Sequence, residues 1–122
     1  FKAPYSASKA GLVNLTKSVA FALTKDNIKV NGLNLGWTHT PGEEKTMEKY
    51  VTKDKNWPTT HGKDLPWGRL IQPIEAAKAI AFMTSSESGL MTGSIIDFDQ
   101  IISGWYADYS GPKKLKDNEL GI

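Results

Sequence analysis

The chain has 122 residues, of which 39% are hydrophobic and 23% are charged, and its formal net charge is +2. This composition suits one modest globular domain and argues against an intrinsically disordered chain. The small net charge argues against a nucleic-acid-binding protein, and no apolar run reaches the roughly 18 residues of a membrane span. Without a cysteine in the sequence, disulfides and thiol chemistry are excluded.

The first predicted element is a long helix over residues 5–25. Its apolar side chains recur at helical spacing, at Leu12, Leu15, Val19 and Leu23. Other apolar and small residues surround them, and a helix that is apolar over much of its circumference is usually buried on more than one side. We therefore expect either a plain core helix or one that packs on a sheet and on a second helix. Asn27 is expected to end it as a left-handed cap.

Tyr5 and Lys9 lie four residues apart near the start of this helix, so we expect them on one face, one turn apart. An ammonium beside a phenol favours the phenolate, and a tyrosine that ionises more easily can give or take a proton in a reaction. The alternative is an ordinary helix in which the tyrosine packs and the lysine is solvated. For the short pattern alone, this alternative is the more common one.

Residues 28–35 are predicted to form a strand, with Ile28, Val30 and Leu33 as its apolar members. A helix that leads by a short turn into an apolar strand indicates an α/β fold. In such sheets ligands bind beyond the carboxyl ends of the strands. Gly36, at this end, lets a ligand approach the backbone, and hydroxyls follow it at Thr38 and Thr40. On these residues a ligand loop and a plain exit loop are equally supported.

Residues 41–68 differ in character from the rest of the chain. A short amphipathic segment that opens at Gly42 runs into a long polar stretch with several prolines and glycines. So long an excursion between a strand and the next helix predicts a mobile lid over a substrate site. Its tryptophans, Trp57 and Trp67, can line a pocket or pin the lid to the body, and pinning is the commoner role. His39 and His61 lack the spacing of metal ligands, so no metal site is expected.

The last predicted elements are a helix over residues 73–83 and a turn with a short strand over residues 92–99. Pro73 at the first turn and Glu75 shortly after it favour a helix start. Residues 104–122 form a tail that is first aromatic and then basic.

Five signals in this order resemble the C-terminal half of a short-chain dehydrogenase/reductase, over about residues 4–100. They are Tyr5-Ser6-Ala7-Ser8-Lys9, the strand end at Gly36-Trp37-Thr38-His39-Thr40-Pro41, a variable excursion, Gly68-Arg69-Leu70 with Pro73-Ile74-Glu75-Ala76-Ala77, and Thr92-Gly93 leading to Asp97. The resemblance implies an α/β fold with a doubly wound parallel, Rossmann-like sheet. Residues 1–122 would be the C-terminal portion of one such domain, with residues 41–68 as its substrate lid.

The family's residue roles fall on six positions of this sequence. The resemblance implies that Tyr5 is the catalytic acid/base and that Lys9 binds the nicotinamide ribose and supports the tyrosine. Cofactor contacts are implied for both of these residues and for the loop after the strand, at Gly36, Trp37, Thr38 and Thr40; no metal is implied. Leu35 stands where the family usually has proline, and Phe98-Asp99 stands where two glycines are common.

The implied activity is that of an NAD(P)-dependent oxidoreductase that interconverts an alcohol and a carbonyl compound. NAD and NADP are both possible, and residues 36–43 are similar to members that act on sugars or polyols. The alternative is a non-catalytic binding or oligomerisation module of the same fold. We expect a homodimer or homotetramer that acts on a small molecule, in the cytoplasm, without nucleic acid or membrane.

The chain begins at Phe1, so we expect either a cleaved product or part of a longer protein. The family's glycine-rich dinucleotide loop, catalytic serine and asparagine precede the tyrosine, and this sequence does not contain them. We therefore expect these 122 residues alone to be inactive.

Overall fold

The computed structural model describes residues 3–101 of the chain. They fall into two compact units: residues 3–36 and 73–98 form the first, and residues 37–72 and 99–101 form the second. The predicted tail at 104–122 lies outside the described residues. None of the helices within residues 3–101 is long and apolar enough to cross a membrane.

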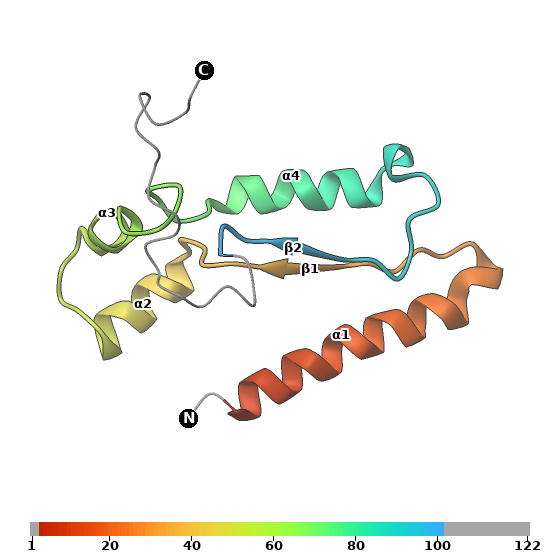
Figure 1. The fold of residues 1–122 in the computed structure, drawn as a ribbon, viewed down its shortest axis with the longest axis horizontal. Coiled ribbons are helices and arrows are strands. Elements are labelled where there is room, and N and C mark those ends of the chain that lie inside the picture. The colour runs from red at the N-terminus through yellow and green to blue at the C-terminus, as the bar shows by residue number, and fades with distance from the viewer. Residues whose placement is uncertain (1–2, 102–122) are drawn as a thin grey trace, which may run out of the picture. The chain divides into compact units, whose positions relative to one another are not determined.

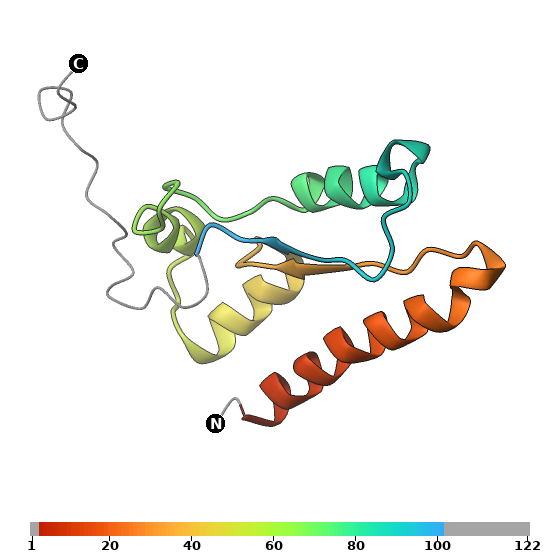
Figure 2. The same ribbon diagram turned by 45° about the vertical axis from the view of Figure 1, so that its right-hand side comes forward.

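The first unit is a two-stranded parallel sheet with a helix on each side. Its elements are α1 (Ala3–Leu23), the 3-10 helix η1 (Thr24–Asp26), β1 (Gly32–Leu35), α4 (Pro73–Thr84), the 3-10 helix η2 (Ser86–Ser88) and β2 (Ile95–Phe98). β1 and β2 run parallel, in register from Gly32 opposite Ile95 to Leu35 opposite Phe98. Figures 1 and 2 show α1 on one side of the strands and α4 on the other. This arrangement confirms the predicted α/β architecture.

The link from α1 to β1 follows the sequence prediction in one respect and departs from it in another. Asn27 ends η1 in the left-handed region, with φ 58°, and its N–H donates to Thr24 O, so the predicted cap is confirmed. The strand is shorter than residues 28–35, however, because side chains replace its first ladder bonds. Val30 N donates to Thr92 Oγ1 at 3.1 Å, and the Asn31 amide bonds to Met91 O and Ser94 N.

α1 is far more exposed than the sequence predicts. Of its described residues only Ala20 is buried, while Leu12, Leu15 and Phe21 are 53%, 56% and 86% exposed. The expectation of burial on more than one side is therefore wrong for this chain. The physical reason is that two short strands cover little of a 21-residue helix. α1 approaches the strand side closely at Gly93, where an added Cβ would lie 3.5 Å from that of Ala20.

The second unit has a core of its own. It contains α2 (Pro41–Tyr50), which confirms the predicted amphipathic segment, and α3 (Trp57–Gly62), which the sequence analysis did not predict. Four buried side chains form its core, with Trp37 and Ile101 packed against them: Met47, Trp57, Leu65 and Leu70. The segment after the predicted strand is thus a small packed structure rather than an irregular excursion.

Gly62, the last residue of α3, offers a test of this packing. A Cβ at this position would lie 3.1 Å from Arg69 Cα and 3.1 Å from Leu70 Cδ1. Because one of these atoms is backbone, the clash cannot be relieved by a side-chain rotation alone. We expect Gly62→Ala to destabilise the second unit by about 1–3 kcal/mol, measured by chemical denaturation of the full-length protein. As a control, Gly42→Ala meets only Thr40 Oγ1 at 3.8 Å and should be tolerated. Equal stabilities of the two variants would contradict the packing.

Asp54 fixes the turn that leads into α3. Its Oδ1 accepts from Asn56 N and its Oδ2 accepts from Thr60 Oγ1, both at 2.8 Å. Chiefly the bond from Asn56 N–H, and then the one from Thr60, lowers the pKa of Asp54 below its usual 3.8. A lowered carboxyl pKa stabilises the folded state above the unfolded pKa, and this contribution is lost as pH falls through the folded pKa.

The resulting pH prediction concerns the acid side of the stability profile. We expect Asp54→Asn to flatten the decline in stability below about pH 4. Denaturation midpoints measured from pH 6 down to pH 2 test this. Asp64→Asn, the same change at another acidic residue of this unit, serves as the control. If the Asp54→Asn and wild-type profiles run parallel throughout this range, the proposed linkage is wrong.

Candidate active site

Tyr5 and Lys9 lie together on α1, as their spacing predicts. Tyr5 belongs to the first turn of the helix, and Lys9 Nζ lies 5.5 Å from the centroid of the Tyr5 ring. Ser8 Oγ donates a hydrogen bond to Tyr5 O at 2.7 Å, which ties the residues between them to the helix backbone. The Tyr5 side chain is 64% exposed, so its phenol is accessible and the ammonium lies over the ring.

The start of α1 lies at the end of the first unit where the parallel strands finish. Figures 1 and 2 show that α1 and β1 run in opposite directions, so the first turn of α1 points to the same end of the unit as the carboxyl ends of the strands. This is the end at which open α/β sheets bind ligands. Tyr5, exposed and with the Lys9 ammonium near its ring, lies on the turn of α1 that points to this end.

The carboxyl end of the sheet is held together by backbone and side-chain bonds. Gly36 N donates to Phe98 O at 3.0 Å, which extends the pairing one residue beyond β1. Asn34 Nδ2 donates to Asp97 Oδ1 at 2.7 Å across the two strands. Leu35, which stands where the family usually has proline, is paired with Phe98 in the ladder.

The other predicted cofactor residues, Trp37, Thr38 and Thr40, belong to the second unit. Thr38 forms a parallel bridge with Ile71, in which Ile71 N donates to Trp37 O at 3.1 Å and His39 N donates to Ile71 O at 2.9 Å. Thr40 is the N-cap of α2, and its Oγ1 accepts from Glu43 N at 3.1 Å. The loop from 37 to 40 therefore has a defined backbone, and the Thr40 oxygen already has a structural role.

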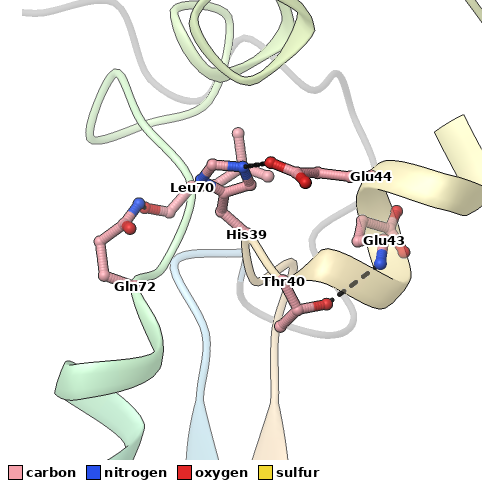
Figure 3. A network of polar contacts seen from close by, with 6 residues as sticks. All are labelled: His39, Thr40, Glu43, Glu44, Leu70 and Gln72. Atoms are coloured by element: carbon pink, nitrogen blue, oxygen red, sulfur yellow. Dashed lines mark hydrogen bonds and ion pairs between the residues drawn. The ribbon is translucent and has the colours of Figure 1, made fainter. Parts of the chain in front are cut away.

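Two acidic residues in the first turn of α2 contact this loop, and the sequence analysis missed both. Glu43 Oε1 accepts from Trp37 Nε1 at 2.8 Å, and Glu44 Oε1 lies 2.9 Å from His39 Nε2. Figure 3 shows the Glu44–His39 pair and the Glu43–Thr40 bond on either side of the loop. The sequence did contain a signal for Glu43, because Thr40 and Glu43 have the three-residue spacing of a helix capping box. The Glu43 carboxylate, however, accepts from an indole.

Aromatic rings fill the interior of the second unit. The Trp37 and Trp57 rings are stacked, with centroids 5.9 Å apart and planes 26° apart. His39 and His61 meet the Trp57 ring edge-on, with centroids at 5.6 Å and 6.4 Å. Trp57 is only 4% exposed, so it packs in this core, whereas Trp67 is 77% exposed. Within residues 3–101, no three His, Asp or Glu side chains gather as a metal site would require.

The comparisons with known proteins agree with the fold. A family model described as enoyl-(acyl carrier protein) reductase matches residues 1–100. The chain is 39% identical over 95 residues to the 3-oxoacyl-[acyl-carrier-protein] reductase of Thermotoga maritima, covering 78% of this chain and 36% of that protein. A short chain dehydrogenase family protein from Francisella tularensis matches with a TM-score of 0.70 at 31% identity, covering 79% of this chain and 41% of that one.

A third match is the L-sorbose reductase of Gluconobacter frateurii, solved with NADPH and L-sorbose. Its TM-score is 0.71 at 28% identity, over 82% of this chain and 40% of that one. The chain thus spans about two fifths or less of the relatives it matches. The family match and the parallel sheet both support membership of one family. The chain belongs to the short-chain dehydrogenase/reductase family and carries the C-terminal part of its doubly wound, Rossmann-like fold.

Proposed function

We propose that the intact protein is an NAD(P)-dependent oxidoreductase that interconverts an alcohol and a carbonyl compound. The observation that carries the proposal is the exposed Tyr5 with the Lys9 ammonium 5.5 Å from its ring, at the carboxyl end of the parallel sheet. A buried tyrosine, or one at the opposite end of the sheet, would not suit this chemistry. Relatives named as reductases, one of them solved with NADPH, support the same class of reaction.

In this proposal each predicted residue has a distinct task. The Tyr5 hydroxyl donates a proton to a carbonyl oxygen, or removes one from an alcohol, and Lys9 holds the ribose hydroxyls. Gly36, Trp37, Thr38 and Thr40 contact the nicotinamide end of the nucleotide. When bound, the nicotinamide supplies or accepts the hydride. The residues fit such a group because Tyr5 is open to a ligand and Gly36 carries no side chain to obstruct it.

For the substrate we propose a sugar or polyol. The support is the loop 36–43 together with the L-sorbose reductase, whose solved complex contains L-sorbose. The Thermotoga maritima relative is instead named for 3-oxoacyl groups on an acyl carrier protein. Assays of the full-length protein with polyols and with a 3-oxoacyl thioester separate the two classes. Turnover of the thioester alone would contradict the sugar assignment and leave the oxidoreductase proposal intact.

We further propose that the protein assembles as a homodimer or homotetramer. The support is the apolar surface that α1 leaves exposed at Leu12, Leu15 and Phe21. This surface also favours the second candidate function, a non-catalytic binding or oligomerisation module of the same fold. A monomer in light scattering of the full-length protein would contradict the assembly.

The experiment that tests the proposed function is hydride transfer by the full-length protein with Tyr5 intact and with Tyr5→Phe. Absorbance of the reduced nicotinamide at saturating substrate reports the rate directly. A non-catalytic module would show no turnover in either form, whereas the proposed enzyme loses its turnover only in the variant.

A further inference from the structure

Glu43 contacts both ends of the loop that carries the proposed cofactor residues of the second unit. Its backbone N–H donates to Thr40 Oγ1 at 3.1 Å, and its carboxylate Oε1 accepts from Trp37 Nε1 at 2.8 Å. Trp37 opens the loop and Thr40 closes it as the N-cap of α2. One half-buried residue is therefore bonded to the first and the last residue of the segment 37–40.

The Trp37 indole is fixed from two directions. One face stacks on Trp57, at 5.9 Å between centroids, and the edge of the His61 ring approaches it at 6.2 Å. Stacking sets the plane of the indole but leaves it free to turn within that plane. The bond from Nε1 to Glu43 removes this freedom, because an indole has a single N–H donor. Trp37 O also accepts from Ile71 N, so side chain and backbone are both held.

The neighbouring carboxylate makes a different contact. Glu44 lies next in sequence, but its Oε1 is 2.9 Å from His39 Nε2 and is engaged there. Figure 3 shows the two glutamates diverging, with Glu43 beside Thr40 and Glu44 directed to His39. The contact to Trp37 is also stronger than a neutral hydrogen bond, because its acceptor is ionised.

We propose that Glu43 is a positioning residue for the nicotinamide nucleotide. Its carboxylate holds the Trp37 indole, at the start of the loop 37–40, in the conformation from which Trp37 contacts the cofactor, and it does not touch the reacting atoms. This inference rests on the proposed function, since it assigns Glu43 to the same site. It predicts a specific kinetic pattern: the Michaelis constant for the nucleotide rises while kcat at saturating nucleotide stays unchanged.

The experiment uses the full-length protein and measures the dissociation constant of NADH and NADPH by their fluorescence, together with steady-state kinetics. Glu43→Ala should weaken nucleotide binding roughly tenfold, because a hydrogen bond to a charged group is lost. Glu43→Gln should restore most of the affinity, since its carbonyl oxygen still accepts from the indole. The matched control is Glu48→Ala, which removes the same charge from an exposed position of α2. It should bind the nucleotide as the wild type does.

A double-mutant cycle tests whether Glu43 acts through Trp37. Trp37→Phe keeps an aromatic ring for the stack but removes the N–H, so it should weaken binding as Glu43→Ala does. The double variant should be no weaker than either single one, because both remove the same bond. Additive losses, or wild-type affinity in Glu43→Ala, would overturn the inference. If the wild type binds neither nucleotide, both the proposed function and the role of Glu43 are wrong. If Tyr5→Phe loses turnover but Glu43→Ala binds the nucleotide as the wild type does, only the role of Glu43 is wrong.

Discussion

Replacing Tyr5 by phenylalanine in the full-length protein is expected to lower kcat by roughly 10²–10⁴-fold, the usual contribution of a positioned acid or base. The substitution removes only the hydroxyl. The ring stays on α1, where the Lys9 ammonium lies 5.5 Å from its centroid. Because the side chain is 64% exposed, no buried partner is lost and the stability of the fold should not change. Nucleotide affinity should change far less than kcat, since Lys9 and the loop residues remain.

The chain offers a matched control for this experiment in Tyr50. Its ring also has a lysine beside it, with Lys49 Nζ 4.8 Å from the centroid, and it is 71% exposed. It is the last residue of α2, in the second unit, whereas Tyr5 belongs to α1 in the first. Tyr50→Phe should therefore turn over at the wild-type rate. Turnover that survives in Tyr5→Phe would refute the acid/base role, and an equal loss in both variants would show that the effect is not specific to Tyr5.

The elements that the sequence predicted well are those whose evidence is local. α1 and α4 follow from apolar spacing, and Pro73 does begin α4. The left-handed Asn27 follows from the preference of asparagine for that backbone region. The position of Lys9 Nζ near the Tyr5 ring also agrees with the shared helix face that a four-residue spacing implies. Each of these features depends on residues within a few positions of one another, so a single sequence contains the information.

The features that the sequence did not predict depend on contacts between distant residues. α3 has six residues and begins Trp57-Pro58, with too few apolar positions to show a period; the burial of Trp57 against Trp37 and Leu70 supports it. β1 begins late because Val30 and Asn31 bond to residues 91–94, about 60 positions away. The exposure of the apolar face of α1 was not predicted either, because it depends on which other residues cover that face. A pattern shows that a surface is apolar, but the partner that covers it need not belong to the same stretch of chain.

The aromatic core explains how a polar segment can be ordered. Trp57 contributes the largest side chain to a cluster with Met47, Leu65 and Leu70, and Trp37 stacks on it. Burial of an aromatic side chain of this size is the main favourable term available to so small a unit. Since the Trp37 indole also bonds to Glu43, the core supports the conformation of the loop from 37 to 40.

Replacing Trp57 by alanine is accordingly expected to destabilise the second unit by about 3–5 kcal/mol, the range for deleting a buried aromatic side chain. The side chain is 4% exposed, so its removal leaves a cavity and removes the surface on which Trp37 stacks. Amide hydrogen exchange of α2 and α3 in the full-length protein measures the loss where it occurs. Protection of α1 and α4 should fall much less, because they belong to the first unit.

Trp67→Ala is the matched control, since it deletes the same side chain from a position that is 77% exposed. The hydrogen bond from Trp67 N–H to Gln100 Oε1, at 3.0 Å, is kept in the variant because it uses the backbone. Its effect on stability should stay within about 0.5 kcal/mol, as for other exposed substitutions. If Trp57→Ala leaves the exchange rates of α2 and α3 unchanged, the second unit does not depend on this core. In that case the stack would not be what holds Trp37 in place, and the bond of its indole to Glu43 would be the stronger candidate.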